Sequence, residues 1–441
     1  MENIFRLPKG TVLTEQLLDE FLVKNFQKTA QRFIKLEKAY CNDYEIFHYP
    51  KKPSWKPDNR IAVNFAKYIT DTFNGFFIGI PVKVSSDDDT VKTYVDFVNS
   101  YNNQDDQNAE LSKICSMFGR GYEMYYVDES TNIGITYLKP TEAFMIYDDS
   151  VLTNSMYFVR YYFDSNNILH GSVSDESTVK YFVRNPTVKY SADEPKQHGF
   201  RGVLAVEFVE NKERIGLYEG SMSMINAFNK AFSEKANDVD YFADAYMKIL
   251  GPRLNEEMAK NIRANRIINF ETDTPEKAVV DFLQKPNADV TQENLINRLI
   301  DMIFMSSMVA NISDENFGTQ SGISLKYKLL CMQNLAKAKE RKFTAGLNLR
   351  YKLIFSNPVS GMKQDDWIKI KYTFTQNYPA NLADEADIAG KLSGVTSRET
   401  QLSALSIVKD VSSELEKIKE EQDITGYNTD YPTARANGDE E

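Results

Sequence analysis

The fold is decided by the stretch from Thr291 to Phe355, which reads TQENLINRLIDMIFMSSMVANISDENFGTQSGISLKYKLLCMQNLAKAKERKFTAGLNLRYKLIF. Its first part, Thr291 to Ala310, has helical spacing, and its second half is apolar on nearly all sides. Such a helix must be surrounded by protein. The polar residues 311–321, with glycines at 318 and 322, predict a mobile connection. A second helix is predicted from Gly322 to Phe355.

The second helix is strongly basic. It carries eight Lys and Arg residues against one acid, Glu340, which gives +7 in a chain whose net charge is -11. A basic helix in an acidic protein indicates a polyanion or an acidic partner surface. A solvated charged face is the alternative reading. The basic residues are Lys326, Lys328, Lys337, Lys339, Arg341, Lys342, Arg350 and Lys352.

Composition predicts a soluble globular protein. The 441 residues are 42% hydrophobic and 12% aromatic, enough for two to four packed domains at roughly 150 residues each. The cysteines, Cys41, Cys115 and Cys331, form no CxxC pair, which favours a reducing compartment. The N-terminus lacks the order of a signal peptide. The longest apolar stretch, Leu299 to Val309, is too short for a bilayer, which takes about 20 residues.

The first half of the chain predicts an α+β domain. Helices are expected over residues 14–39, from Asn59 to the Gly79 and Pro81 breakers, and over 91–100 and 108–118. After Gly119 the periodicity changes to two, which predicts one antiparallel sheet. Its strands are expected at 122–127, 133–138, 143–146, 156–162, 178–183 and 203–208.

A long helix is predicted over residues 222–250. Its apolar residues fall on alternating steps of three and four, a seam about 45 Å long at 1.5 Å per residue. Its acids could form a stripe facing a channel, with a solvated face as the alternative. The acids are Glu234, Asp238, Asp240 and Asp244, and the residues expected to pack in the two helices are Phe228, Phe232, Phe242, Leu299, Ile303 and Phe304.

The remaining segments are shorter. Residues 253–290 predict a compact insert with a helix at 256–265, a strand at 267–270 and an extended run at 278–283. Residues 367–374 alternate, which predicts a strand returning to the sheet. The C-terminal part predicts helices with capping boxes at Thr396 and Ser413. Residues 423–441 have little apolar content and are expected to be disordered.

No catalytic constellation is predicted. Ile323 stands where a phosphate-binding loop needs Lys. The histidines, at 48, 170 and 198, lack metal-ligand spacing, and no Gly-x-Ser-x-Gly elbow is present. The runs Asp87–Asp89 and Asp148–Asp149 are read as solvated turns in preference to divalent-ion sites. Neither a cofactor nor a metal is expected.

Three parts of the chain resemble the portal proteins of long-tailed phages that infect Gram-positive bacteria. The most telling is FGTQSGISLKYK at 317–328, continued by KERKF at 339–343. The second is NRIAVNFA at 59–66 followed by GIPV at 79–82. The third is ADEAD at 383–387, GVTSRETQLS at 394–403, Asp410 and ELEKI at 414–418. With the matching order of elements, the resemblance covers most of the chain from Asn59 to Glu421.

The resemblance implies a portal fold with named parts. These are an α/β wing at 1–221 completed by 322–380, stem helices at 222–250 and 291–310, a small clip at 251–290, a tunnel loop at 311–321, the long basic helix at 322–356 and a helical crown at 381–422. The tunnel loop residues are Ser313, Asp314, Glu315, Asn316, Phe317, Gly318, Thr319 and Gln320.

The resemblance also implies a function. It is a ring of this chain, a dodecamer, at one capsid vertex, through which double-stranded DNA is packaged and ejected. The implied partners are the large terminase subunit, the major capsid and scaffolding proteins and head-completion adaptors, with assembly in the host cytoplasm. Asp314 and Glu315 would repel DNA phosphates, and Lys326 and Lys328 are the nearest cations. The alternatives are a capsid-associated adaptor or a metal-dependent nucleic-acid enzyme using Asp148 and Asp149.

Overall fold

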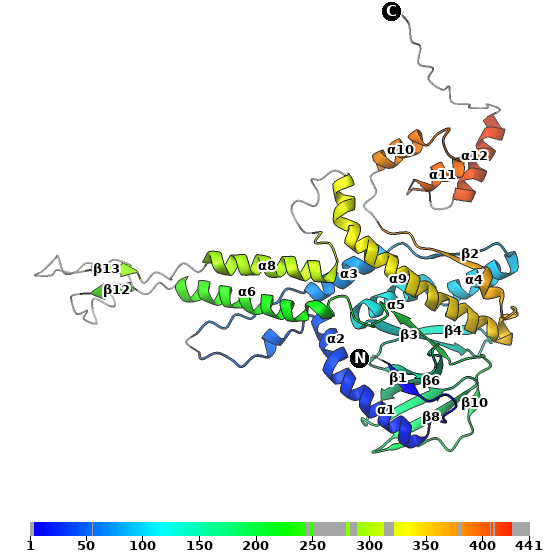
Figure 1. Ribbon diagram of the computed structural model, residues 1–441, viewed down its shortest axis with the longest axis horizontal. Helices are drawn as coiled ribbons and strands as arrows, with labels where there is room; N and C mark the ends of the chain where they lie inside the picture. The colour runs from blue at the N-terminus through cyan, green and yellow to red at the C-terminus, as the bar shows by residue number, and fades with distance from the viewer. Residues whose placement is uncertain are drawn as a thin grey trace, which may run out of the picture. The chain divides into compact units, whose positions relative to one another are not determined.

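The computed structural model of the protein describes residues 4–54, 56–243, 247–250, 279–282, 289–312, 322–377, 382–405, 407–408 and 411–425. The chain divides into two compact units, residues 1–376 and 377–441. Every described strand belongs to the first unit, and the described part of the second unit is helical (Figure 1). The predicted α+β class is confirmed.

The predicted helix at 14–39 is confirmed as three consecutive helical pieces. They are α1 (Glu15–Lys28), a π-helical turn (Thr29–Phe33) and α2 (Ile34–Tyr40). The Thr14 hydroxyl caps α1 by accepting a hydrogen bond from Leu17 N, at 3.3 Å. Residues at helical spacing on α1 are buried, and they pack against the large sheet: Leu18, Phe21 and Leu22.

The next helix, α3 (Phe65–Ile78), begins later than predicted. Its N-cap is Asn64, whose side chain accepts from Lys67 N at 3.0 Å. The predicted helical start at Asn59 is wrong, because residues 59–64 have no helical structure. The two short helices that follow are confirmed as α4 (Asp89–Tyr101) and α5 (Gln104–Phe118). Helix α5 stops at Gly119, with φ +81°, where a Cβ would lie 2.2 Å from the backbone of Arg214.

The strands form two main sheets, so the predicted single antiparallel sheet is wrong. The larger sheet has the order β1-β5-β6-β7-β8-β10, with β9 also paired to β8. Strand β1 (Phe5–Leu7) runs parallel to β5, and the other pairs are antiparallel. The remaining strands are β5 (Ala143–Asp148), β6 (Ser155–Phe163), β7 (Leu169–Ser174), β8 (Thr178–Arg184), β9 (Val188–Tyr190) and β10 (Lys196–Gln197).

The smaller sheet is antiparallel, with β3 (Arg120–Val127) between β11 (Ala205–Val209) and β4 (Ile133–Leu138). Side chains from the α4–α5 turn bind the outer edge of β4. Asn102 accepts from Ile135 N at 2.8 Å and donates to Ile133 O at 2.9 Å, and Gln107 donates to Ile135 O at 3.2 Å. These amides therefore occupy hydrogen-bonding groups that an edge strand leaves open.

The main core lies between the smaller sheet, helices α2 to α5 and the long helix α9 (Gly322–Ser356). A separate cluster lies between residues of the two sheets, including Tyr122, Met145, Phe158 and Ala205. Helix α9 confirms the predicted second helix of the quoted stretch. It contributes buried side chains along its length: Leu329, Met332, Ala336, Phe343, Leu347, Tyr351 and Ile354.

The predicted helix at 222–250 is shorter than expected. Helix α6 is Met222–Ala243, and Met247–Leu250 is a strand, β12, paired with β13 (Val279–Phe282). The other helix of the pair, α8, runs from Asp289 to Ser307, three residues short of the predicted end, and Met308 has φ +59°. Helices α6 and α8 lie side by side (Figure 1). The predicted helix at 256–265 and strand at 267–270 lie outside the described residues.

The predicted strand at 367–374 does not return to a large sheet. Residues Asp366–Lys369 form a 3-10 turn, and only Ile370–Thr373 is a strand, β14. It pairs with β2 (Lys83–Ser86) in a separate two-stranded sheet. Lys371 and Asp87 form an ion pair of 2.6 Å beside this ladder.

The second unit contains α10 (Leu382–Lys391), α11 (Arg398–Ser403) and α12 (Val411–Thr425). The N-cap of α11 is Ser397, which accepts from Thr400 N, so the predicted cap at Thr396 is one residue early. Ser413 lies inside α12, so the second predicted cap is also wrong. Residues 423–425, predicted to be disordered, belong to α12, and residues 426–441 lie outside the described part of the chain.

Candidate functional site

The base of the α6–α8 hairpin is an aromatic cluster shared with α3. The ring of Phe65 lies edge-on to Phe228 of α6, with centroids 5.0 Å apart, and 5.9 Å from Phe304 of α8. Tyr68 lies 5.6 Å from the same Phe304 ring. Ser221 Oγ, just before α6, donates to Ile303 O at 3.4 Å. The hairpin is therefore anchored on the main core at this end.

The residues predicted to pack in the hairpin differ in burial. Phe228 and Ile303 are buried, and Leu299 and Phe304 are partly buried against the same core. Phe232 stacks on Phe228 at 5.7 Å but keeps 37% of its surface exposed. Phe242 lies in the last turn of α6.

Farther along, polar contacts join the two helices of the hairpin. Lys235 of α6 pairs with Glu293 of α8. Gln292 Nε2 donates to Asp238 Oδ2 at 3.1 Å. The seam between the helices is therefore apolar at its base and polar farther out.

Extended residues 59–64, here called the strap, lie along α6 and are bound by its side chains. Backbone N–H groups of the strap donate to side-chain oxygens of α6: Asn59 to Asn237 Oδ1 at 2.6 Å, Ile61 to Ser233 Oγ at 2.9 Å and Val63 to Asn229 Oδ1 at 3.0 Å. Ser233 Oγ is also 3.1 Å from Ile61 O. Every second N–H of an extended chain points the same way, and every fourth residue of a helix lies on one face. The spacing of the N–H groups along the strap therefore matches the spacing of the side chains along α6.

The strap and the loop before it also contact two of the predicted channel acids. Lys52 Nζ lies 2.9 Å from both carboxylate oxygens of Glu234. Asn59 Nδ2 donates to Asp240 Oδ2 at 2.5 Å. With Asp238 held by Gln292, the three described acids all have partners within the chain, and Asp244 lies outside the described residues.

Helix α9 is tied to α5 and the smaller sheet by two buried ion pairs and their hydrogen bonds. Lys339 Nζ lies 2.7 Å from Glu210 and donates to Ser112 O and Ser116 Oγ at 3.0 and 2.7 Å. Arg350 donates to both oxygens of Glu123, at 2.8 and 2.5 Å, and to Asn108 Oδ1 at 2.6 Å. Burial raises the pKa of the Glu210 carboxyl above its ordinary value, although the Lys339 ammonium opposes the rise.

These pairs correct part of the reading of α9 as a basic surface. Lys339 and Arg350 are buried and neutralised by acids from distant segments, and Lys337 pairs with Glu340 at 2.7 Å. Arg341 and Lys352 are exposed cations of the helix. Lys326 and Lys328 lie in its first two turns. The external charge of α9 is therefore smaller than the sequence alone indicates.

A family model described as "Phage portal protein, SPP1 Gp6-like" matches residues 19–425. The chain belongs to this phage portal family. The match includes the hairpin, the strap, α9 and α10 to α12.

Two portal proteins are similar to this chain over most of their length. The portal protein of Bacillus phage SPP1 is 22% identical over 447 aligned positions, which cover 93% of this chain and 86% of the relative. The portal protein of Clostridium phage phiCD119 is 22% identical over 398 positions, covering 83% and 87%. The family predicted from the three sequence runs is confirmed.

The predicted tunnel loop of this portal-family chain lies mostly outside the described residues. Asn311 and Ile312 are described, and Ile312 N donates to Tyr68 Oη at 2.8 Å. Residues Ser313 to Gln320 are outside the described ranges. The loop therefore starts from a backbone that is held against α3.

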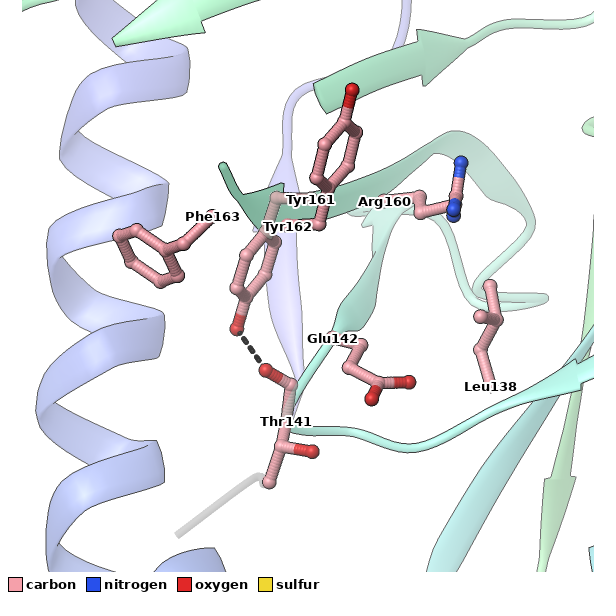
Figure 2. A pocket seen from close by; sticks show the side chains of 7 residues that line it. All are labelled: Leu138, Thr141, Glu142, Arg160, Tyr161, Tyr162 and Phe163. Carbon is pink, nitrogen blue, oxygen red and sulfur yellow. Dashed lines mark hydrogen bonds between the residues drawn. The ribbon is translucent and has the colours of Figure 1, made fainter. Parts of the chain in front are cut away.

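A shallow depression of about 400 Å³ lies on β6 (Figure 2). Its lining includes Glu142 and Arg160, and the Tyr161 hydroxyl donates to Thr141 O at 2.7 Å. Asn25 Nδ2 donates to the same hydroxyl at 2.8 Å. Burial raises the pKa of Tyr161, and its two hydrogen bonds tie β6 to α1 and to the turn before β5.

The aspartate pair of the enzyme alternative has a structural role. The Asp148 carboxylate accepts from Ser150 Oγ and from Asn154 N, at 2.7 and 2.8 Å, and the Ser150 hydrogen bond lowers its pKa. Asp149 Oδ1 accepts from Lys9 N at 3.1 Å. Within the described ranges, no three His, Cys, Asp or Glu side chains are grouped to hold a metal ion. No helix in that part of the chain is both long and apolar enough to cross a membrane.

The strap contact was missed by sequence reasoning. A polar row at 229, 233 and 237 was visible as a signal, since its spacing places these side chains on one face of α6. Nothing in that spacing identified residues 59–64 as the partner.

Proposed function

We propose that this chain is the subunit of a phage portal ring, a conduit at one capsid vertex for packaging and ejecting double-stranded DNA. Membership of the portal family over residues 19–425 supports the proposal. The role is structural, and the free energy for DNA movement comes from a separate terminase motor.

One observation carries the ring arrangement. Helix α8 buries Ile296 and Ile303 against the core, yet Leu295, Met302 and Met305 are 52%, 39% and 73% exposed. Apolar side chains gathered on one side of a helix mark an interaction surface. Each contributes about 1.5–3 kcal/mol when fully buried. Neighbouring copies in a closed ring would cover this side of α8.

We assign the parts of the ring from the resemblance to portal proteins. We assign the wing to residues 1–221 with 322–380, the stem to α6 and α8, and the clip to 251–290. The tunnel loop is 311–321, and the crown is 381–422. The clip would meet the terminase and later the head-completion adaptors, and the wing would meet the capsid and scaffolding proteins. The finished ring belongs to the virion.

The conduit would repel DNA instead of binding it. Asp314 and Glu315 of the loop would face the phosphates, and like charges keep a moving duplex from being held. None of the described acids of α6 is assigned to the channel, because Glu234 and Asp240 face the strap region and Asp238 contacts Gln292 of α8. Lys326 and Lys328 are the cations nearest the loop in sequence.

Native mass spectrometry with negative-stain images of the full chain tests the ring. We expect a closed ring of about a dozen copies with a central hole. Met305→Asp should reduce the ring fraction, because it places a charge in the apolar contact. Val151→Asp, at a fully exposed site on the β5–β6 loop, is the matched control and should assemble normally. A monomer or dimer at all concentrations would contradict the proposal.

Deleting Asp314 to Gln320 tests the conduit. In phage carrying this deletion, we expect assembled capsids that contain less DNA than wild type. Unchanged DNA per capsid would remove the loop from the mechanism while leaving the ring assignment intact.

A further inference from the structure

Helix α9 presents one exposed stripe opposite its core-facing side. Its C-terminal half carries Arg341, Ala345, Leu349 and Lys352, which recur at steps of three and four residues. Leu349 is 50% exposed between the two cations. At 1.5 Å per residue, the stripe from Arg341 to Lys352 is about 16 Å long. It combines an apolar centre with a cation at each end.

Helix α4 and the tip of the β3–β4 hairpin present an exposed aromatic patch. Phe97 and Tyr101 stack with centroids 5.7 Å apart and are 48% and 47% exposed. The Tyr101 hydroxyl donates to Asp128, which joins helix and hairpin. Glu129, an exposed acid, follows Asp128 at the tip of the hairpin.

The stripe and the patch are separate surfaces of one copy. The inner side of α4 packs on α9: Tyr351 Oη donates to Asn99 Oδ1 at 2.8 Å, and the Tyr94 ring lies 6.0 Å from the Phe355 ring. The exposed side chains of α4 and of α9 therefore cannot cover each other within one chain. Among the described residues of the first unit, both surfaces keep exposed side chains that a second copy could cover.

We propose that the α9 stripe of one copy docks on the aromatic patch of the next copy in the ring. Leu349 packs on Phe97 and Tyr101, and the cations of the stripe lie toward Glu129 at the tip of the hairpin. This inference rests on the proposed portal ring. It is a contact between two unlike faces, the kind that closes a ring by rotation.

The chemistry of the two faces selects this partner. The stripe is basic and apolar, and the patch is acidic and aromatic, so charge and apolar surface both match. Arg and Lys side chains also bind aromatic faces directly. A DNA duplex would suit the two cations but not Leu349, whose side chain would face phosphates. A second protein surface covers all four residues of the stripe.

Disulfide trapping tests the contact. In a Cys41→Ser/Cys331→Ser background, which removes the exposed cysteines, the full chain carries Phe97→Cys and Leu349→Cys. Mild oxidation of assembled rings should give a ladder of covalent multimers on a denaturing gel. Phe97→Cys with Val151→Cys is the matched control and should give none.

The other outcomes of trapping are distinct. Rings by native mass spectrometry without a ladder overturn the docking and leave the portal proposal standing. If the variant that carries only Phe97→Cys forms a crosslink, the aromatic patches of two copies contact each other. This result also overturns the proposed docking. If the background protein forms no ring, the proposed function itself fails.

Charge exchange gives a second readout. Arg341→Glu/Lys352→Glu and Glu129→Lys should each raise the concentration needed for assembly about ten-fold, and mixing the two variants should restore part of it. Normal assembly of both variants would overturn the docking. Normal rings that bind less DNA only in the α9 variant would assign the stripe to DNA instead.

Discussion

Helices α6 and α9 are both charged in sequence, but their charges are used in different ways. The two strongest contacts of α9 are buried ion pairs with Glu123 and Glu210. The acids of α6 instead meet Lys52, Asn59 and Gln292 near the surface. Buried pairs are costly to break, whereas exposed pairs contribute little. We therefore expect α9 to be held rigidly against the rest of the first unit. The part of α6 away from the core should shift more easily.

The largest expected effect tests the fixed helix. Glu123→Gln leaves the Arg350 guanidinium buried without its counter-charge, so we expect a loss of about 3–5 kcal/mol in the free energy of unfolding. Urea denaturation of the full chain, followed by circular dichroism, measures it. The double variant Glu123→Leu/Arg350→Met is the control and should recover most of the loss. A single variant as stable as wild type would show that the pair does not hold α9.

The strap should respond more weakly. Asn229→Ala removes the acceptor of Val63 N–H, which we expect to cost about 1–2 kcal/mol locally. Hydrogen exchange should then be faster at the Ile61 and Val63 amides than in wild type. Lys230→Ala, an exposed change one residue along α6, is the matched control. Equal hydrogen-exchange rates in the two variants would show that the Asn229 side chain does not hold the strap on α6.

A pH titration sharpens the comparison further. The pKa of Glu210 is raised in the folded chain, so folded protein takes up this proton before unfolded protein does. Its contribution to stability is therefore present below the ordinary glutamate pKa and is lost as pH rises through the folded value. Each unit of pKa difference is worth about 1.4 kcal/mol.

Glu210→Gln removes the titrating carboxyl and should abolish this pH-dependent contribution to stability. We expect the unfolding free energy of wild type, relative to the variant, to increase as pH falls from neutral toward about 4.3. Thermal melts across that range measure the difference. If the unfolding free energy of wild type relative to the variant stays constant or decreases as pH falls, the raised pKa of Glu210 is contradicted.

The smallest effect is expected for the surface pair on α6. Lys52→Ala should change the unfolding free energy by less than about 1 kcal/mol, and added salt should reduce the difference. A double-mutant cycle with Glu234→Gln isolates the pair. A coupling as large as that of Glu123 and Arg350 would remove the distinction between the two helices.

Sequence reasoning succeeded where local pattern and tertiary packing agree. The turn at Gly119 separates α5 from β3, because only a residue without a Cβ fits there. The two helices of the hairpin were each predicted from their apolar spacing. The α6 helix was extended too far because Met247–Leu250, a strand, continues the same apolar recurrence.

Contacts between segments that are far apart in the chain could not be predicted from the local sequence pattern. The strap alternates Ile61 and Val63 as a strand does, yet its backbone partners are side chains of a helix. The acids that neutralise Lys339 and Arg350 lie more than 100 residues away, so α9 was read as more basic outside than it is. Strand β7 was missed because His170, Gly171 and Ser172 weaken its apolar alternation.

The amides on β4 have a consequence for production of the protein in quantity. An open strand border can recruit the same border of another copy into misfolded aggregates. Asn102 and Gln107 occupy Ile133 O and both backbone groups of Ile135, so this border has few groups left to recruit a strand. Ordered assembly through side-chain surfaces is thereby favoured over uncontrolled strand addition.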